Sequence, residues 1–385
     1  MIESAAIDKY RNMIFRLSIA RAPSAPTAIY PLHQTQHKVD GPGFGVCVAI
    51  SAFLAVCAAI ATPASAATKI TFVTDWKAQA EHGGFYEAVA EGLYAKRGLD
   101  VRILQGGPSI NVPQLLAGGA ADFGMGSNDF IAFNIVKAGA PIRAVAAIFQ
   151  KDPQVLIAHP RPDIKKLADM KGKPIMISDA ATTAFWPWLK AKFGFEDSQI
   201  RKYTFNLAPF LVDPKAIQEG YVTSEPYTIE KQGKFKPQVY LLADNGYPGS
   251  ANLILVPQKW IDTKPEIVQA FVEASIQGWT HYLYGNPKPA NALIKRDNPE
   301  MTDDLLAQAI AKMKSYGILE QPGLKLHRIG QMSDAQWKTF FDTMVSEKLY
   351  PPTLDYRKAY TLQFVQGLIN DGKDVGRIEF ELEKR

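Results

Sequence analysis

The sequence predicts an α/β protein with two lobes and a ligand cleft between them. Short apolar runs alternate with helical segments after residue 66, glycines follow the helices, and the alternation falls into two blocks. Strands separated by one helix each are typical of mainly parallel sheets. Because open sheets of this kind bind ligands beyond the carboxyl ends of their strands, two such sheets predict a site in the cleft.

The first block begins at Lys69. Its apolar runs predict strands at Lys69–Val73, Leu99–Leu104, Ala121–Met125 and Ile142–Phe149. Its longer mixed segments predict helices at Gly84–Arg97, Ile110–Ala117 and Asp129–Ala138. Glycines follow these helices, where a left-handed residue commonly ends a helix: Gly98, Gly118, Gly119 and Gly139.

The second block follows Pro160–Asp163 and leads into a helical tail. It predicts strands at Pro174–Ser178, Tyr221–Thr223, Gln238–Ala243 and Leu253–Val256, and helices at Thr182–Phe193 and Pro226–Gln232. The tail predicts helices at Glu266–Tyr284, Lys288–Lys295, Asp303–Ser315 and Asp334–Glu347. We expect the chain to cross between lobes near 158–162 and 244–249. Residues 67–160 and 247–385 then form the first lobe and residues 161–246 the second.

Residues 1–66 predict a cleaved secretory signal with a long N-terminal extension. The uncharged apolar run Phe44–Ala61 follows five basic residues and precedes Ala64-Ser65-Ala66, which has the form of a signal-peptidase site. A retained anchor is one alternative, because eighteen apolar residues are the lower limit of a span. A lipoprotein site at Cys57 is another, although Val56 before it is unusual there.

Composition restricts the function classes. The chain has 385 residues, of which 47% are apolar and 21% charged, as in globular proteins. Without the predicted signal, 38 basic and 35 acidic residues remain, a net charge of about +3. This small positive charge does not indicate a nucleic-acid-binding protein. Both cysteines, Cys47 and Cys57, lie in the predicted signal, so the remainder has no disulfide, thiolate nucleophile or cysteine metal ligand.

The segment TDWKAQAEHGGFY, residues 74–86, follows the first predicted strand and is the first candidate ligand loop. Trp76 could stack on a planar ligand, His82 could form a hydrogen bond to it, and Gly83-Gly84 permits close backbone approach. Alternatively, Trp76 covers the core and His82 faces solvent. Clustering at one strand end favours the ligand interpretation, since loops on rigid scaffolds carry function.

Three further segments place polar residues between a strand and a helix. In FGMGSND, Ser127 or Asn128 could cap a helix and hold an anionic or carbonyl group, or serve as an ordinary cap. A dinucleotide fingerprint would need a third glycine where Asp129 stands. In SDAATT, Thr182 and Thr183 could point hydroxyls at a ligand, whereas the aromatic residues Phe185, Trp186 and Trp188 suit the core.

The fourth segment is YVTSEPY, residues 221–227. Glu225 stands at a strand end before a proline, where its carboxylate could accept hydrogen bonds from ligand N–H groups, and Tyr227 follows as a further candidate contact. The alternative is a carboxylate that stabilises the start of a helix. Catalytic and metal motifs are missing: the sequence has no HExxH, Walker or GxSxG element, and His82, His159, His281 and His327 form no metal-spaced pair. We therefore expect no enzyme activity and no metal or cofactor.

These segments resemble the NMT1/THI5-like substrate-binding proteins of ABC importers, a family that includes sulfonate, nitrate and thiamine-pyrimidine binders. The matching elements span roughly residues 68–320: the DW…HGGxY element from Asp75 to Tyr86, Gly98–Val101, Leu116–Gly124, Ala147–Pro153 and Gly220–Pro226.

The resemblance implies a type II periplasmic binding protein fold and a periplasmic, monomeric receptor that delivers a small molecule to permease and ATPase subunits. It implies an aminopyrimidine ligand, with Trp76 and Tyr86 as stacking walls and His82 and Glu225 as polar contacts. Ser127, Asn128, Thr182 and Thr183 would be helix-end donors. In this sequence Lys77–Glu81 lacks the Pro-Asn character of clear pyrimidine binders.

Other ligands and activities stay open within this resemblance. Riboflavin, sulfonate, taurine and nitrate are alternative ligands, although small anions rarely face a carboxylate such as Glu225. A thiamine-pyrimidine synthase of the same fold would need a cysteine-rich iron motif, which residues 67–385 lack. A LysR-type effector domain would need a preceding helix-turn-helix pattern, and the N-terminal segment has none.

Overall fold

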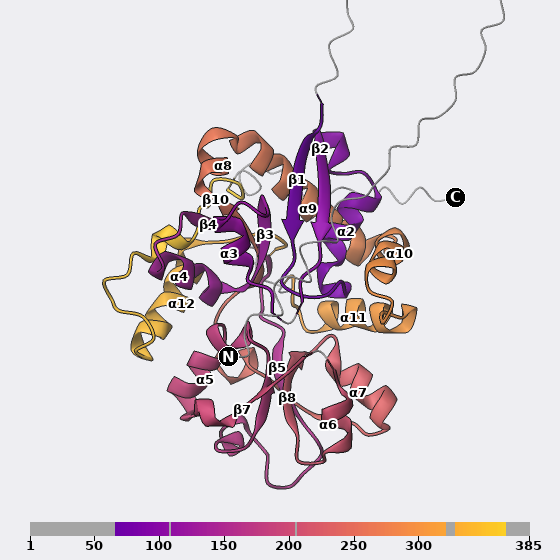
Figure 1. The fold of residues 1–385 in the computed structure, drawn as a ribbon, viewed down its shortest axis with the longest axis vertical. Coiled ribbons are helices and arrows are strands. Elements are labelled where there is room, and N and C mark those ends of the chain that lie inside the picture. The colour runs from indigo at the N-terminus through magenta and orange to yellow at the C-terminus, as the bar shows by residue number, and fades with distance from the viewer. Residues whose placement is uncertain (1–65, 108, 205, 321–327, 367–385) are drawn as a thin grey trace, which may run out of the picture. The chain divides into compact units, whose positions relative to one another are not determined.

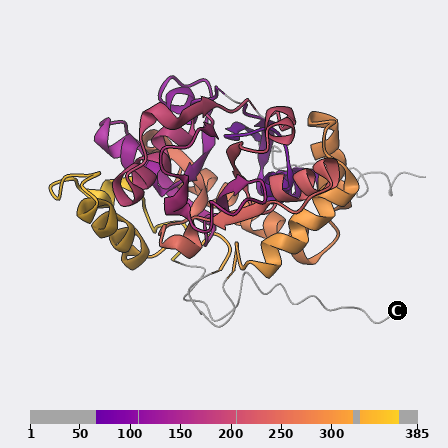
Figure 2. The ribbon, with the colours of Figure 1, turned by 90° about the horizontal axis from the view of Figure 1, so that it is seen from below.

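Two five-stranded sheets organise the chain in the computed structural model, which describes residues 66–107, 109–204, 206–320 and 328–366. The first sheet has the strand order β2-β1-β3-β10-β4 and the second β7-β6-β8-β5-β9 (Figure 1). Helices flank both sheets, as the view turned by 90° also shows (Figure 2). The predicted signal lies outside the described residues except for Ala66.

Each sheet mixes parallel and antiparallel strands. The first contains β1 (Thr68–Val73), β2 (Leu99–Leu104), β3 (Phe123–Asn128), β4 (Ile142–Phe149) and β10 (Ala251–Pro257). The second contains β5 (Gln154–Ala158), β6 (Ile175–Ile177), β7 (Ile200–Lys202), β8 (Ile217–Tyr221) and β9 (Gln238–Leu241). In the first sheet β10 runs antiparallel to both of its neighbours, and in the second β5 does so. The remaining pairs are parallel.

Most of the described helices match segments predicted from the sequence, whereas Ala208–Val212 and Gln258–Thr263 were not predicted to be helical. The helices in the two blocks are α2 (Gly83–Ala90), α3 (Val112–Ala117), α4 (Asp129–Lys137), α5 (Trp186–Phe193), α6 (Ala208–Val212) and α7 (Glu225–Gly233). The tail forms α8 (Gln258–Thr263), α9 (Pro265–Tyr284), α10 (Lys288–Asp297), α11 (Asp303–Ser315) and α12 (Asp334–Ser346). Within the described residues, no helix combines the length and apolar character needed to cross a membrane.

The structure differs from the sequence prediction around the second sheet. β5 was not predicted, and it pairs within the second sheet although the range expected for the first lobe ran to residue 160. β8 ends at Tyr221, where the sequence predicted a strand to begin. β5 was missed although residues 150–153 separate it from β4, because a run of five residues has no clear periodicity of its own.

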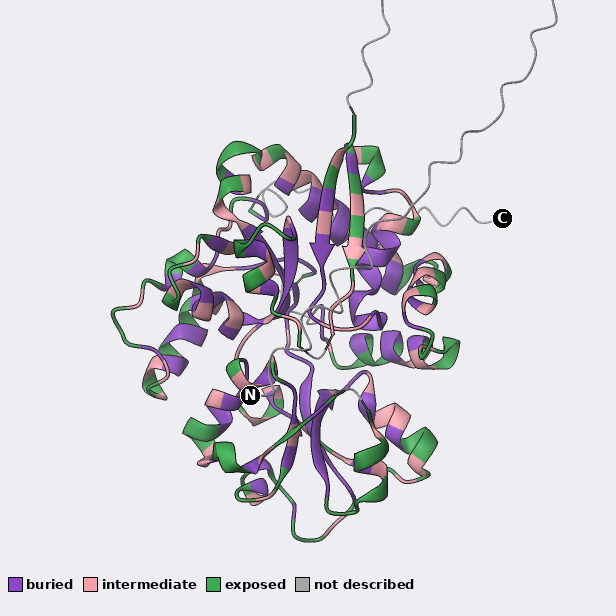
Figure 3. Cartoon of the chain, in the orientation of Figure 1, coloured by how far each residue is buried: buried purple, intermediate pink, exposed green. Residues whose placement is uncertain are grey.

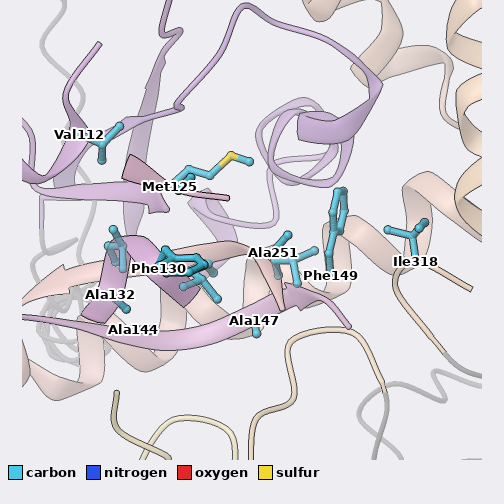
Figure 4. Close-up of a cluster of buried hydrophobic side chains, with 14 of the residues drawn as sticks. Val112, Met125, Phe130, Ala132, Ala144, Ala147, Phe149, Ala251 and Ile318 are labelled. Atoms are coloured by element: carbon cyan, nitrogen blue, oxygen red, sulfur yellow. The ribbon is translucent and has the colours of Figure 1, made fainter. Parts of the chain in front are cut away.

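The core of the first lobe surrounds the central strands. β3, β4 and β10 are buried along almost their whole length, whereas in the edge strand β2 exposed residues alternate with buried or half-buried ones (Figure 3). Small side chains such as Ala144, Ala147 and Ala251 lie in one buried cluster with Phe130 of α4 and Phe149 of β4 (Figure 4). This close packing gives the loops at the strand ends a rigid base.

Glycines allow α2 and α9 to pack in direct contact. A Cβ atom at Gly84 would lie 2.1 Å from Cγ of Trp279, and one at Gly83 would lie 2.1 Å from Cε1 of Tyr282. A Cβ at Gly278 would lie 2.2 Å from the backbone oxygen of Gly84. The glycine pair expected to approach a ligand therefore serves the packing of two helices.

Replacing Gly278 with Ala is expected to destabilise the protein. Alanine favours a helix over glycine by about 0.5–1 kcal/mol, but here its methyl group meets backbone atoms, and overpacking of this kind costs about 1–3 kcal/mol. Thermal unfolding should show a lower midpoint for Gly278→Ala and little change for Gly107→Ala, whose added Cβ would have no atom within 4 Å. A stabilised Gly278→Ala variant would contradict the packing described.

Candidate functional site

A cavity lies where strand ends of the two sheets meet. It encloses about 580 Å³, its open mouth included. The loop after β1 and the last two residues of β3 contribute from the first lobe. The start of β5 and residues at or after the ends of β6, β7 and β8 contribute from the second. The polar lining residues are Asp75, Gln79, His82, Ser127, Asn128, Gln154, Ser178, Glu219 and Glu225. The aromatic ones are Trp76, Phe185, Tyr203 and Tyr221.

Hydrogen bonds hold the first-lobe side of the cavity in place. The Thr74 hydroxyl donates to the backbone oxygen of Trp76 at 2.8 Å and accepts from the backbone N–H of Gly106 at 3.1 Å. This fixes the loop that carries Asp75, whose Oδ2 accepts a hydrogen bond from Ser127 Oγ. The other oxygen, Oδ1, lies 3.7 Å from Nε2 of the buried His82. A carboxylate and an imidazole are thus fixed side by side at the cavity wall.

Backbone N–H groups orient two carboxyl groups on the second-lobe side. Glu219, within the central strand β8, accepts from the N–H of Ser178 at 2.9 Å. Glu225, the first residue of α7, accepts from the N–H of Tyr221 at 2.8 Å. Each glutamate uses one oxygen for this bond, which leaves the other for a ligand.

The cavity is rich in acceptors. Three of its described lining residues are acidic and none is Lys or Arg. Burial raises the pKa of Glu219 to about 8 and that of Glu225 to about 7. The backbone hydrogen bonds lower both pKa values, but burial has the larger effect. An ionised carboxylate only accepts hydrogen bonds, so a ligand that presents N–H groups or positive charge compensates the cost of ionising these groups.

Several buried polar atoms at the cavity have no hydrogen-bond partner within the described chain. They are Nδ1 and Nε2 of His82, Oδ1 of Asn128 and Oε2 of Glu219. Buried polar groups in native proteins are nearly always paired, and leaving one unpaired costs about 1–3 kcal/mol. These atoms are therefore the ones at the cavity wall that would gain a partner from a polar ligand or an ordered water.

Aromatic rings close one side of the cavity. Trp76 of the first lobe and Tyr203 of the second contact each other, with ring centroids 6.4 Å apart and planes inclined by 34°. Phe185 also lines the cavity, although the sequence suggested a core position for it, while Trp186 and Trp188 are buried in the core. Flat surfaces from both lobes suit a planar ligand.

Half of the predicted site residues lie at this cavity: Trp76, His82, Ser127, Asn128 and Glu225. Gly83 and Tyr86 lie in α2 instead, and the Tyr86 hydroxyl donates to Asp297 of α10 at 3.0 Å. Thr182 and Thr183 line a second, adjoining groove. Tyr227 donates to Asp304 of α11 at 2.9 Å. Their roles in ligand contact stay predictions.

Several cavity residues were missed from the sequence, chiefly Gln79, Gln154, Ser178, Tyr203, Glu219 and Tyr221. Glu219 carried a usable signal, because an acid inside a central, buried strand needs a partner or a function. Tyr203 carried none, since it lies in an irregular stretch after the three-residue strand β7.

Contacts between the lobes surround the cavity. The Thr223 hydroxyl of the second lobe donates to the buried carboxyl of Glu81, and Gln308 of α11 donates to the Thr223 backbone oxygen at 2.5 Å. On another side, Asn134 of α4 donates to the backbone oxygen of Thr183 at 2.8 Å. These hydrogen bonds join the two lobes on two sides of the cavity.

Two buried acids lie where the chain crosses between lobes. Asp152, in the first crossing, accepts from the N–H of Gln154 at 2.8 Å, and Asp129 accepts from the N–H of Ser250, in the second crossing, at 2.9 Å. Burial raises the pKa of Asp129 to about 8 and of Asp152 to about 7, and each carboxyl also feels a neighbouring aspartate. Both crossings are thus held by carboxyl groups that favour the protonated form.

These groups make stability depend on pH. Because their folded pKa values lie above the unfolded ones, the folded protein binds more protons, and the resulting stabilisation is lost as pH rises through about 7 to 8. The unfolding temperature of the ligand-free protein should fall by several degrees between pH 5.5 and 8.5. Asp129→Asn should reduce this fall of the unfolding temperature with pH. An unchanged fall in that variant would show that the Asp129 carboxyl group does not cause it.

Comparisons with known proteins agree with this geometry. The family model described as NMT1/THI5 like matches residues 79–290. The chain is 25% identical over 310 residues to the riboflavin-binding protein RibY of Chloroflexus aurantiacus, covering 78% of this chain and 86% of that protein. It is 23% identical over 265 residues to a formylaminopyrimidine-binding protein of Halalkalibacterium halodurans, covering 66% and 79% of the two chains.

A solved structure shares the fold. The alkanesulfonate-binding protein SsuA of Xanthomonas axonopodis pv. citri superposes with a TM-score of 0.54 at 14% identity, covering 77% of this chain and 99% of that one. The type II periplasmic binding protein fold expected from the sequence is therefore confirmed.

Proposed function

The chain belongs to the NMT1/THI5-like family, and from this premise we propose that it is the solute-binding receptor of an ABC importer. Its ligand is a planar heterocyclic nutrient with exocyclic or ring N–H groups, such as an aminopyrimidine precursor of thiamine. In this proposal the receptor acts outside the cytoplasmic membrane as a monomer, binds and releases the ligand unchanged, and hands it to permease and ATPase subunits.

The observation that carries the proposal is the set of acceptors around the cavity. Glu219, Glu225 and Asp75 face a space whose described lining has no Lys or Arg. A sulfonate or nitrate would be brought close to carboxyl groups and would need the donors that anion sites use. An aminopyrimidine presents N–H groups to carboxylates and a flat ring to Trp76, Tyr203 and Phe185. A flavin ring system is the second ligand class compatible with the same features.

A thermal-shift panel tests the proposal. The purified protein is heated with formylaminopyrimidine, hydroxymethylpyrimidine, thiamine, riboflavin, taurine, alkanesulfonates and nitrate. A ligand at 100 times its dissociation constant adds about 2.7 kcal/mol of stability. We expect a shift with a pyrimidine or a flavin, and its loss in Trp76→Ala, which removes one flat wall. A shift with sulfonates or nitrate alone would overturn the proposed ligand class.

A further inference from the structure

A second hollow adjoins the cavity and continues away from it along α4. This α4 groove encloses about 1870 Å³, its open mouth included, and shares Asp75, Ser127 and Ala180 with the cavity. Because the same side chains form part of both linings, the cavity and the groove adjoin at these three residues.

The walls of the α4 groove are mostly apolar. Val112, Met125 and Phe130, labelled in Figure 4, are buried core residues of the first lobe that also line it, and Ile131 of α4 is half-buried beside them. The opposite wall comes from the second lobe, with Ala180 and Pro187. The inner cavity, in contrast, is lined by acceptors. The two spaces therefore favour different chemistry.

We propose that the site takes a two-part ligand, in which a planar, donor-rich ring occupies the acceptor-lined cavity and an apolar or aromatic substituent extends into the α4 groove. The inference rests on the proposed function for the ring and adds the substituent. The bond that joins the ring to its substituent lies at Asp75, Ser127 and Ala180, where the two hollows adjoin. The substituent lies against Ile131. Thr182 and Thr183, which line the groove and not the cavity, then contact the substituent.

The size of the two spaces supports this division. The cavity encloses about 580 Å³ and the groove about 1870 Å³, both with their mouths included. Ligand pockets usually enclose most of the surface of their ligand. A single ring would leave the larger, apolar space wet, whereas a substituent that enters it removes apolar surface from water and gains affinity.

A matched pair of compounds tests the inference by calorimetry. The first is 4-amino-2,5-dimethylpyrimidine, and the second carries a benzyl group in place of the 5-methyl group. We expect both to bind the purified protein and the benzyl compound to bind at least tenfold more tightly. Ile131→Asn should remove this advantage while leaving the dissociation constant of the dimethyl compound within about twofold.

Val136→Asn is the matched control, since Val136 is a half-buried apolar residue of the same helix that does not line the groove. It should preserve the advantage of the benzyl compound. Equal affinities for the two compounds, or an advantage that survives in Ile131→Asn, would overturn the role of the groove and leave the receptor assignment intact. If the dimethyl compound does not bind, the proposal that the cavity holds an aminopyrimidine ring is wrong, and so is the two-part ligand inferred from it.

Discussion

Replacing Glu225 with Gln is expected to weaken ligand binding about ten- to hundredfold, because hydrogen bonds to charged groups contribute about 1.5–3 kcal/mol. Glu225 is buried at the cavity, and one of its oxygens already accepts from the N–H of Tyr221. An amide in its place directs an NH₂ group either at that N–H or at the N–H groups of the ligand. Glu225→Ala should lose binding as well, since it removes both acceptors. Isothermal titration with the ligand found in the thermal-shift panel measures the effect.

Glu230→Gln provides the control, because Glu230 is an exposed residue of the same helix and lies outside the cavity. It should bind the ligand as the unmodified protein does. Retained affinity in Glu225→Gln, together with a normal unfolding temperature, would show that this carboxyl group does not contact the ligand.

Truncation of Trp279 to Ala should give the largest loss of stability, about 3–5 kcal/mol. The indole is fully buried in α9 and packs edge-on against Phe85 of α2 and Phe149 of β4, with ring centroids 5.8 and 5.5 Å away. It also fills the space above Gly84, so its removal leaves a cavity at the contact between α2 and α9. Chemical denaturation would measure the change.

Trp260→Ala is the matched comparison. Trp260 lies in α8, is half-buried and packs edge-on against Phe123 at 5.3 Å. Less buried surface is lost there, so its truncation should cost clearly less than that of Trp279. Equal losses would mean that the contact between α2 and α9 does not dominate the stability of the first lobe.

The fold was largely accessible from the sequence because its signals are local. Strand–helix alternation and helix-ending glycines predicted most elements of the first sheet. The antiparallel placement of β10 between β3 and β4 was not accessible, since pairing between strands more than a hundred residues apart leaves no local pattern. The strand β5 was missed for another reason, since a run of five residues has no clear periodicity of its own.

The sequence predicted cavity residues only where they stand between a strand and the start of a helix. His82, Asn128 and Glu225 stand at strand ends beside helix starts, and the pattern there indicated them. Gly83 and Gly84 follow the same pattern but serve helix packing against Trp279 and Tyr282, which lie almost two hundred residues further along the chain. A small residue beside a ligand and a small residue beside a helix look alike in sequence. Only the tertiary neighbours distinguish them.

The contacts between the lobes bear on how long a ligand stays bound. Thr223 contacts Glu81 and Gln308, none of which lines the cavity or the α4 groove, and Asn134 contacts the Thr183 backbone beside the groove. A ligand that leaves by separation of the two lobes has to break these bonds. Its residence time is therefore governed in part by side chains that it never contacts.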